Sequence, residues 1–131
     1  MTTSLPIALD MLLEQCCGSG EFAASLLSDF GKDLLARCAG IIRHLDASDA
    51  PAVTATAHCL KGSAGMLGAA GLSEIAARIE AAGRSGDLAD SAPLAAQLRD
   101  EAQRCLQFLP AMQAELAASV EIGAGAIDAC N

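Results

Sequence analysis

Alanine and leucine dominate the apolar residues of this chain, and this bias constrains the fold more than any other feature. The 131 residues include 29 Ala and 18 Leu, whereas Trp and Tyr are absent and Phe occurs three times. A β-sandwich or barrel needs Val, Ile, Thr and aromatic side chains, and a parallel sheet needs runs of Val and Ile. Because neither pattern occurs, the sequence predicts packed helices.

The charge of the chain excludes several classes of function. Eight basic residues stand against sixteen acidic ones, for a net charge of −8. Such a chain gains nothing from counterion release on nucleic acid and is repelled by anionic lipid. No charge-free apolar run approaches the ~18 residues that a membrane span needs, and no basic region precedes an apolar stretch at the N-terminus. We expect no nucleic-acid partner, no membrane association and a cytoplasmic location.

The six cysteines do not form a recognisable disulfide or zinc pattern. No CxxC pair occurs, and the chain is long enough to form a core without cross-links. We therefore predict reduced thiols, most of them small core residues, and no metal site. The cysteines are Cys16, Cys17, Cys38, Cys59, Cys105 and Cys130.

Apolar residues recur every three or four positions in five segments, as expected for amphipathic helices. The most regular segment starts near Ser19, its predicted N-cap, and ends near Asp46. Short loops between helices make sequential neighbours antiparallel. The sequence therefore predicts an all-α fold, an antiparallel up-and-down four-helix bundle with a short N-terminal leader helix. The five segments span about 6–17, 19–46, 49–68, 71–82 and 91–118.

Glycine and proline mark the expected ends of the later helices. Gly83 should end the fourth helix ahead of a loop over 84–87, and Pro110 should kink or break the fifth, because proline removes a backbone hydrogen bond. The Gly/Ala-rich C-terminal stretch shows no period. We predict one domain over 1–118 and a flexible tail over 119–131.

His58 is expected on the exposed face of the third helix, roughly 150° from its apolar stripe. Gly62 and Gly65 follow on the same face, and each glycine in a helix interior costs about 1 kcal/mol relative to Ala. Bare positions there would let another protein approach the imidazole, and Lys61 could reach an anion attached to it. A histidine that accepts a phosphoryl group needs both features. Spacing alone leaves an inert surface histidine as an open alternative.

The stretch Ala57–Ala64, with the sequence AHCLKGSA, resembles the motif of histidine-containing phosphotransfer (HPt) domains from multistep two-component phosphorelays. In that family the histidine is followed by Lys and Gly at three and four residues, and by a second Gly at ten, here Gly68. The resemblance covers about 110 of the 131 residues. Further family positions are matched by Phe30, Asp49, Ile79, Glu80, Gly86 and Asp87.

The resemblance implies a phosphocarrier without kinase activity of its own. His58 would accept a phosphoryl group from the phosphoaspartate of a receiver domain and pass it to the Asp of a second receiver. Lys61 would stabilise the phosphoryl charge, and Gly62 would provide steric access. The partners implied are response-regulator receivers and a hybrid sensor histidine kinase. No cofactor is expected in this chain, since the Mg²⁺ belongs to the receiver, and we expect a monomer.

The docking surface is expected on the third and fourth helices around His58. Met66 departs from the family pattern, because many members carry Asn or Ser there, which leaves Lys61 and Thr54 as the nearest polar candidates. No residue can be identified from the sequence as the partner that holds the imidazole tautomer. The predicted partner-binding residues are Thr54, Gly65, Met66, Glu74, Ala77, Arg78 and Ala81.

Two other classes of function stay open at this point. The first is an HPt-like interaction module that binds a receiver or kinase domain without phosphotransfer, although such a scaffold does not need the His58 and Lys61 pair. The second is a small metal-binding bundle. That reading is weak, because Lys61 and Gly62 occupy the positions where a second ligand would follow His58 on a helix.

Overall fold

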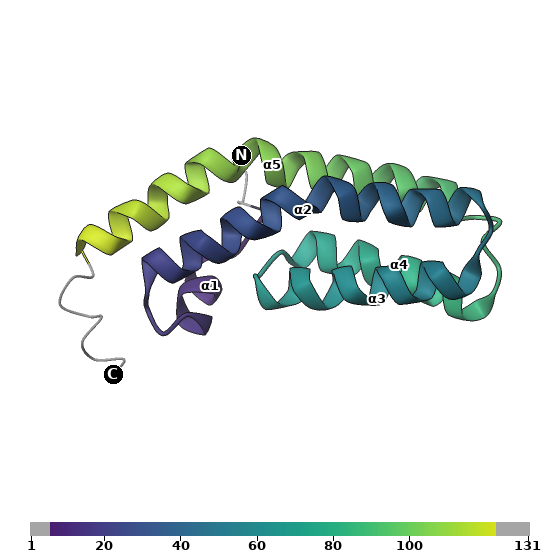
Figure 1. Ribbon diagram of the computed structural model, residues 1–131, viewed down its shortest axis with the longest axis horizontal. Coiled ribbons are helices and arrows are strands. Elements are labelled where there is room, and N and C mark those ends of the chain that lie inside the picture. Colours follow the sequence, from purple (N-terminus) through teal and green to yellow (C-terminus); the bar gives the residue numbers. More distant parts are fainter. Residues whose placement is uncertain (1–5, 123–131) are drawn as a thin grey trace.

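The computed structural model describes residues 6–122 as an all-helical chain (Figure 1). No strand occurs within these residues, so the predicted all-α class is confirmed. The first helix is shorter than predicted at both ends. The helices are α1 (Leu9–Gln15), α2 (Gly20–Asp46), α3 (Ala50–Met66), α4 (Ala70–Ser85) and α5 (Ala92–Ile122).

The four long helices are arranged as two pairs. Helix α2 lies beside α5, and α3 lies beside α4, with further contacts of α2 to α3 and of α4 to α5. Figure 1 shows that α3, α4 and α5 each run opposite to the helix before them. The short helix α1 lies at the end of the molecule where α2 begins. This arrangement surrounds a single core with four amphipathic helices.

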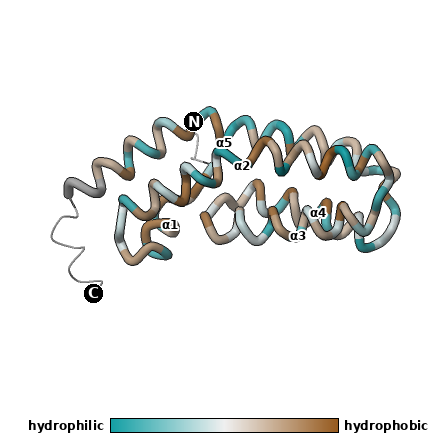
Figure 2. Tube along the Cα trace, in the orientation of Figure 1, coloured by the Kyte–Doolittle hydropathy of each residue, from teal (hydrophilic) through white to brown (hydrophobic). Residues whose placement is uncertain are grey.

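The core follows the three- and four-residue spacing of the apolar side chains. Figure 2 shows hydrophobic and hydrophilic positions alternating along α2 and α5, as expected for helices with one buried face. Phe22 is an exception to this pattern, since it is an apolar residue that is 54% exposed at the start of α2. The buried side chains of α2 beyond its first turn are Leu27, Phe30, Leu34, Cys38, Ile41 and Leu45.

Polar side chains cap the two helices that lead to the site. The Oγ atom of Ser19 accepts a hydrogen bond from the backbone N–H of Phe22, at 3.1 Å. Asp49 Oδ1 accepts one from the N–H of Ala52, at 3.3 Å, at the start of α3. Each cap satisfies one of the unpaired donors in the first turn of its helix. The N-cap predicted at Ser19 is thereby confirmed, and Asp49 caps α3.

Two helices extend beyond their predicted ends. Helix α4 passes through Gly83 to Ser85, and Gly86 ends it with a φ of +79°. Helix α5 passes through Pro110 without a break, although its course bends in Figure 1. It also includes residues 119–122, part of the stretch predicted to be a tail, while 123–131 lie outside the described residues. Side chains of α5 are buried on both sides of Pro110, among them Cys105 and Met112, and such packing stabilises a helix across an interruption.

Five cysteines lie in the described part of the chain, and all five are free thiols. Burial raises the pKa of Cys38 to about 11 and that of Cys105 to about 12, so these core thiols stay protonated and unreactive. Cys17 and Cys59 are exposed, whereas Cys16 is buried. Cys130 lies outside the described residues. No helix within 6–122 is long and apolar enough to cross a membrane.

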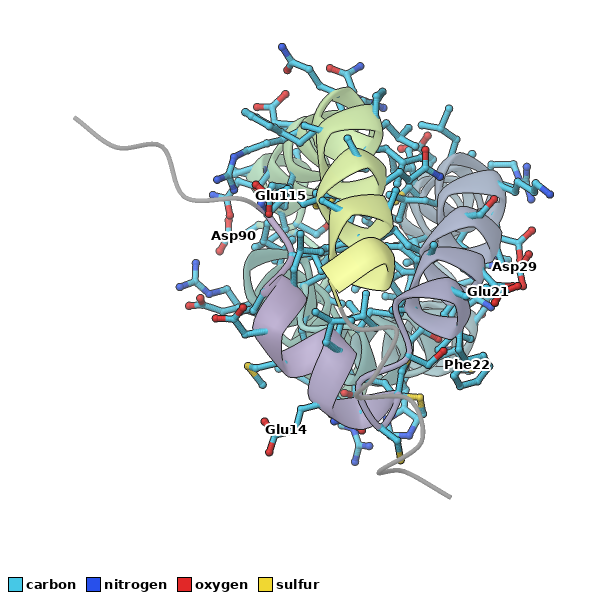
Figure 3. All side chains as sticks on the ribbon, turned by 90° about the vertical axis from the view of Figure 1, so that its left-hand side faces the viewer. Glu14, Glu21, Phe22, Asp29, Asp90 and Glu115 are labelled. Carbon is cyan, nitrogen blue, oxygen red and sulfur yellow. The ribbon has the colours of Figure 1, made fainter. Side chains whose placement is uncertain are left out.

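Most acidic side chains lie on the outer surface of the molecule. Viewed from the end that carries α1, the labelled carboxylates in Figure 3 point away from the core. Charged groups avoid the core because desolvation is costly unless a partner compensates for it. Any buried carboxylate in this chain therefore needs a specific explanation. The labelled acids are Glu14, Glu21, Asp29, Asp90 and Glu115.

Candidate functional site

His58 lies on the outer face of α3, and its side chain is 60% exposed. The opposite face of α3 packs into the core through Val53, Ala57 and Leu60. One turn after His58, the α-carbon of Gly62 faces open space, since a Cβ placed there would meet no atom within 4 Å. The imidazole therefore stands beside a stretch of helix that presents no side chain.

Glu80 of α4 is the direct partner of His58. Its carboxylate is only 4% exposed, and its Oε2 atom lies 2.8 Å from His58 Nδ1. Hydrogen bonds from Lys61, Arg84 and His58 lower the pKa of Glu80 to about 2, against the opposing effect of burial. An ionised carboxylate can only accept, so Nδ1 carries the proton and donates it to Glu80. In the neutral ring this leaves Nε2 with its lone pair available.

Two basic side chains share the same carboxylate. Lys61 Nζ lies 2.7 Å from Glu80 Oε1, and Arg84 Nη2 lies 2.8 Å from Oε2. Arg84 Nε makes a longer hydrogen bond to Oε2, at 3.3 Å. A buried carboxylate with three donors is compensated in charge and restricted in orientation. Lys61, expected to reach a phosphoryl group, is therefore held beside the histidine by Glu80.

Thr54 contributes to helix packing rather than to the His58 network. Its hydroxyl donates a hydrogen bond to the carbonyl of Ala50, at 2.8 Å, within its own helix. The side chain is half-buried against Gly83 of α4. The prediction that Thr54 supplies a polar group near the phosphoryl position is therefore not supported by this geometry. A threonine hydroxyl in a helix often bonds to the carbonyl four residues back.

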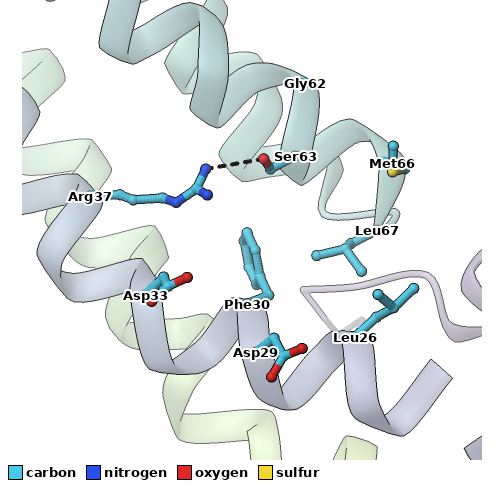
Figure 4. Close-up of a pocket in the computed structure, with 9 residues that line it drawn as sticks. All are labelled: Leu26, Asp29, Phe30, Asp33, Arg37, Gly62, Ser63, Met66 and Leu67. Atoms are coloured by element: carbon cyan, nitrogen blue, oxygen red, sulfur yellow. Dashed lines mark hydrogen bonds between the residues drawn. The ribbon is translucent and has the colours of Figure 1, made fainter. Parts of the chain in front are cut away.

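A cavity of about 510 Å³ lies between α2 and α3 on one side of Gly62 (Figure 4). The guanidinium of Arg37 donates a hydrogen bond to Ser63 Oγ, at 3.1 Å, across its mouth. Met66 is 64% exposed at its edge, so the departure from the family pattern places an apolar side chain on the surface near the site. The other lining residues are Leu26, Asp29, Phe30, Asp33 and Leu67.

The remaining predicted docking residues lie on α4, except Gly65, which lies near the end of α3. Gly65, Glu74 and Ala77 line a second cavity, of about 410 Å³. Arg78 forms an ion pair with Glu74, at 2.9 Å, and Ala81 is exposed on the following turn. The structure thus brings three of these residues to one surface depression. Their role in partner binding stays a prediction.

Glu80 and Arg84 are the site residues that the sequence reasoning missed. Glu80 follows Ala76 by four residues, so the helical period places this acid on the buried side of α4, which is an unusual position for a carboxylate. Arg84 follows Glu80 by four residues, the spacing of a helical ion pair. The spacing between Glu80 and Arg84 did not indicate an ion pair in the sequence analysis, because Gly83 was predicted to end the helix before Arg84. Within the described residues, no three His, Cys, Asp or Glu side chains gather as a metal site would require.

Comparison with protein families agrees with this geometry. The family model described as "Hpt domain" matches residues 25–108, which is more than half of the chain. The chain therefore belongs to the Hpt domain family, whose members carry out histidine phosphotransfer in two-component systems together with receiver domains and kinases. Searches among curated proteins and among solved structures find no match.

Proposed function

We propose that this protein is a phosphocarrier of a multistep phosphorelay. His58 accepts a phosphoryl group from the phosphoaspartate of one receiver domain and delivers it to the Asp of another. The observation that supports this most is the hydrogen bond from Nδ1 to the buried Glu80 carboxylate, at 2.8 Å. It fixes one tautomer of an exposed imidazole, beside a glycine that leaves room for a partner.

The proposed transfer uses the lone pair of Nε2. This nitrogen attacks the phosphorus of the phosphoaspartate, a bond from Nε2 to phosphorus forms, and the bond from phosphorus to the Asp oxygen breaks. The Asp leaves as a carboxylate. The ring proton stays on Nδ1, where Glu80 stabilises the positive charge that develops on the imidazole. Delivery to the second receiver is the reverse reaction with a different acceptor.

We assign different tasks to the two cations on Glu80. Lys61 lies on the same helix as His58, three residues further on, and can turn from Glu80 Oε1 towards the phosphoryl oxygens. Arg84 lies on α4, like Glu80, and stays on Oε2 when Lys61 turns away. The negative charge of Glu80 is therefore compensated by a basic side chain both before and after transfer. This chain's contribution is orientation and charge, in accord with phosphoryl transfer in general.

The partner surface is proposed to cover His58, Gly62 and the residues around them. Receiver domains and a hybrid sensor kinase are the proposed partners, and the Mg²⁺ that assists transfer is supplied by the receiver. The protein acts as a monomer in the cytoplasm and has no kinase activity of its own. Helices α2 to α5 form the antiparallel four-helix bundle of the functional domain, and α1 is its leader.

The test is phosphorylation of His58→Gln by a panel of phosphorylated receivers. The variant should fold with unchanged helicity and should accept no acid-labile phosphate. His44→Gln is the matched control, since His44 is the second of the two histidines and should not matter. Undiminished acid-labile phosphate on His58→Gln would overturn the proposal. Tight binding of a receiver without any phosphate on the wild-type protein would instead support the pure interaction module.

A further inference from the structure

The backbones of α3 and α4 approach each other closely at Gly83. A Cβ placed on this buried residue would lie 2.5 Å from Thr54 Oγ1, 2.9 Å from Thr54 N and 3.1 Å from the Ala50 carbonyl oxygen. The last two are backbone atoms, which cannot move aside as the tip of a side chain can. Only glycine therefore permits this separation of the two helices.

This contact lies one helical turn from the His58 and Glu80 pair. Gly83 follows Glu80 by three residues, and Thr54 precedes His58 by four. Both contacts therefore lie along the interface between α3 and α4, which we call the seam. On the other side of the pair, Ser73 Oγ donates a hydrogen bond to the Lys61 carbonyl, at 3.1 Å. The seam is thus held by a backbone contact on one side of the site and by a hydrogen bond on the other.

We propose that Gly83 is a positioning residue, which sets the separation of α3 and α4 so that Glu80 reaches His58 Nδ1. The inference rests on the proposed function, because the purpose of this geometry is to keep Nε2 available for phosphoryl transfer. Hydrogen bonds from an N–H group to an oxygen span about 2.7 to 3.2 Å, and the observed 2.8 Å between His58 Nδ1 and Glu80 Oε2 leaves little room for α4 to move outward.

A larger residue at position 83 would act selectively on the site. Lys61 and His58 belong to α3, whereas Glu80 and Arg84 belong to α4. An outward shift of α4 would lengthen both contacts across the seam, while the pair of Arg84 and Glu80 would move as a unit. His58 would then lose its acceptor and exchange between its two neutral tautomers.

The experiment compares Gly83→Ala with the wild type by two measurements. The ¹⁵N shifts of the His58 ring report the tautomer. Phosphorylation by phosphoramidate reports reactivity without a docking partner, since Nε2 attacks phosphorus and ammonia leaves. We expect a mixture of tautomers and a phosphorylation rate lower on the order of tenfold, by analogy with metal-bound histidines, where loss of the group that orients the ring has an effect of that order.

The matched control is Gly40→Ala, in the middle of α2. Its added Cβ would meet only Arg43 Nη2, at 3.8 Å, so it tests the gain in helix propensity alone. It should leave both the tautomer and the rate unchanged. Should Gly83→Ala fail to fold, Thr54→Leu widens the same contact from α3 without altering the backbone of α4, and the same two results are expected.

A double-mutant cycle separates positioning from general destabilisation. If Gly83 acts through Glu80, Gly83→Ala should slow phosphorylation much less in a Glu80→Ala background than in the wild type. An unchanged tautomer and a wild-type rate in Gly83→Ala would overturn the inference, as would equal slowing in both backgrounds. Failure of the proposed function would look different: no receiver would phosphorylate the wild type, while the tautomers of the two proteins would still differ.

Discussion

The two pairs of helices in this bundle are built on different chemistry. The α2 and α5 pair contributes buried apolar side chains such as Leu34 and Met112, and a Cβ placed on Gly31 would meet only side-chain tips of α5, those of Leu109 and Leu106. The α3 and α4 pair meets through backbone atoms at Gly83 and carries a buried carboxylate between the helices.

This difference separates the part of the molecule that supplies stability from the part that supplies geometry. Apolar contacts are tolerant of small shifts, because flexible side chains can repack. The hydrogen bonds of a buried carboxylate do not tolerate such shifts, because their energy depends on distance and angle. A buried charged group that loses its hydrogen-bond partner also destabilises the protein. Substitutions in the two pairs should therefore affect different measurements.

The largest expected effect on transfer, apart from removing His58, comes from adding a side chain at Gly62, on the exposed face of α3. Gly62→Leu should lower transfer from a phosphorylated receiver on the order of a hundredfold, because the leucine occupies the space of the docking partner. The fold should be unchanged or gain up to about 1 kcal/mol in helix propensity, since a Cβ at Gly62 meets no atom within 4 Å. Urea unfolding and transfer kinetics measure the two effects separately. Transfer at the wild-type rate in this variant would refute the proposal that Gly62 leaves room for the docking partner.

The second effect falls on the other pair of helices and on stability. Leu34→Ala removes a fully buried side chain from α2 and should cost about 2 to 5 kcal/mol of unfolding free energy. Transfer measured where the variant is still folded should match the wild type. Leu35→Ala is the control, because Leu35 is 56% exposed and its loss should change stability little. A large loss of transfer in folded Leu34→Ala would show that the two pairs are not independent.

The smallest effect is a pH dependence that belongs to the α3 and α4 pair alone. The pKa of Glu80 is lowered from 4.5 to about 2, so the stability that its ion pairs provide is fully present above pH 4.5 and is lost as the pH falls towards 2. Glu80→Gln lacks this titration. The difference in melting temperature between the wild type and this variant should therefore shrink over that interval, and a constant difference would contradict the assignment.

Local sequence predicted much of the fold, and it also indicated His58 as the residue proposed to accept the phosphoryl group. The spacing of apolar residues and the N-cap at Ser19 indicated the number and order of the helices, although not all of their ends, since these signals act within one or two turns. The exposed histidine with its bare neighbour Gly62 was visible in the same way. Gly83 was misjudged, because a glycine that ends a helix and one that permits close packing look alike without the neighbouring helix.

By itself, the sequence determined an all-helical chain that presents His58 next to Lys61 and Gly62. Only the tertiary structure decided which nitrogen of the ring is free to react. Glu80 lies 22 residues from His58 along the chain, and its carboxylate reaches Nδ1 because α4 packs closely on α3. A helical period relates neighbours on one helix. The tautomer depends on a distance between two helices, which is set by how closely their backbones can pack.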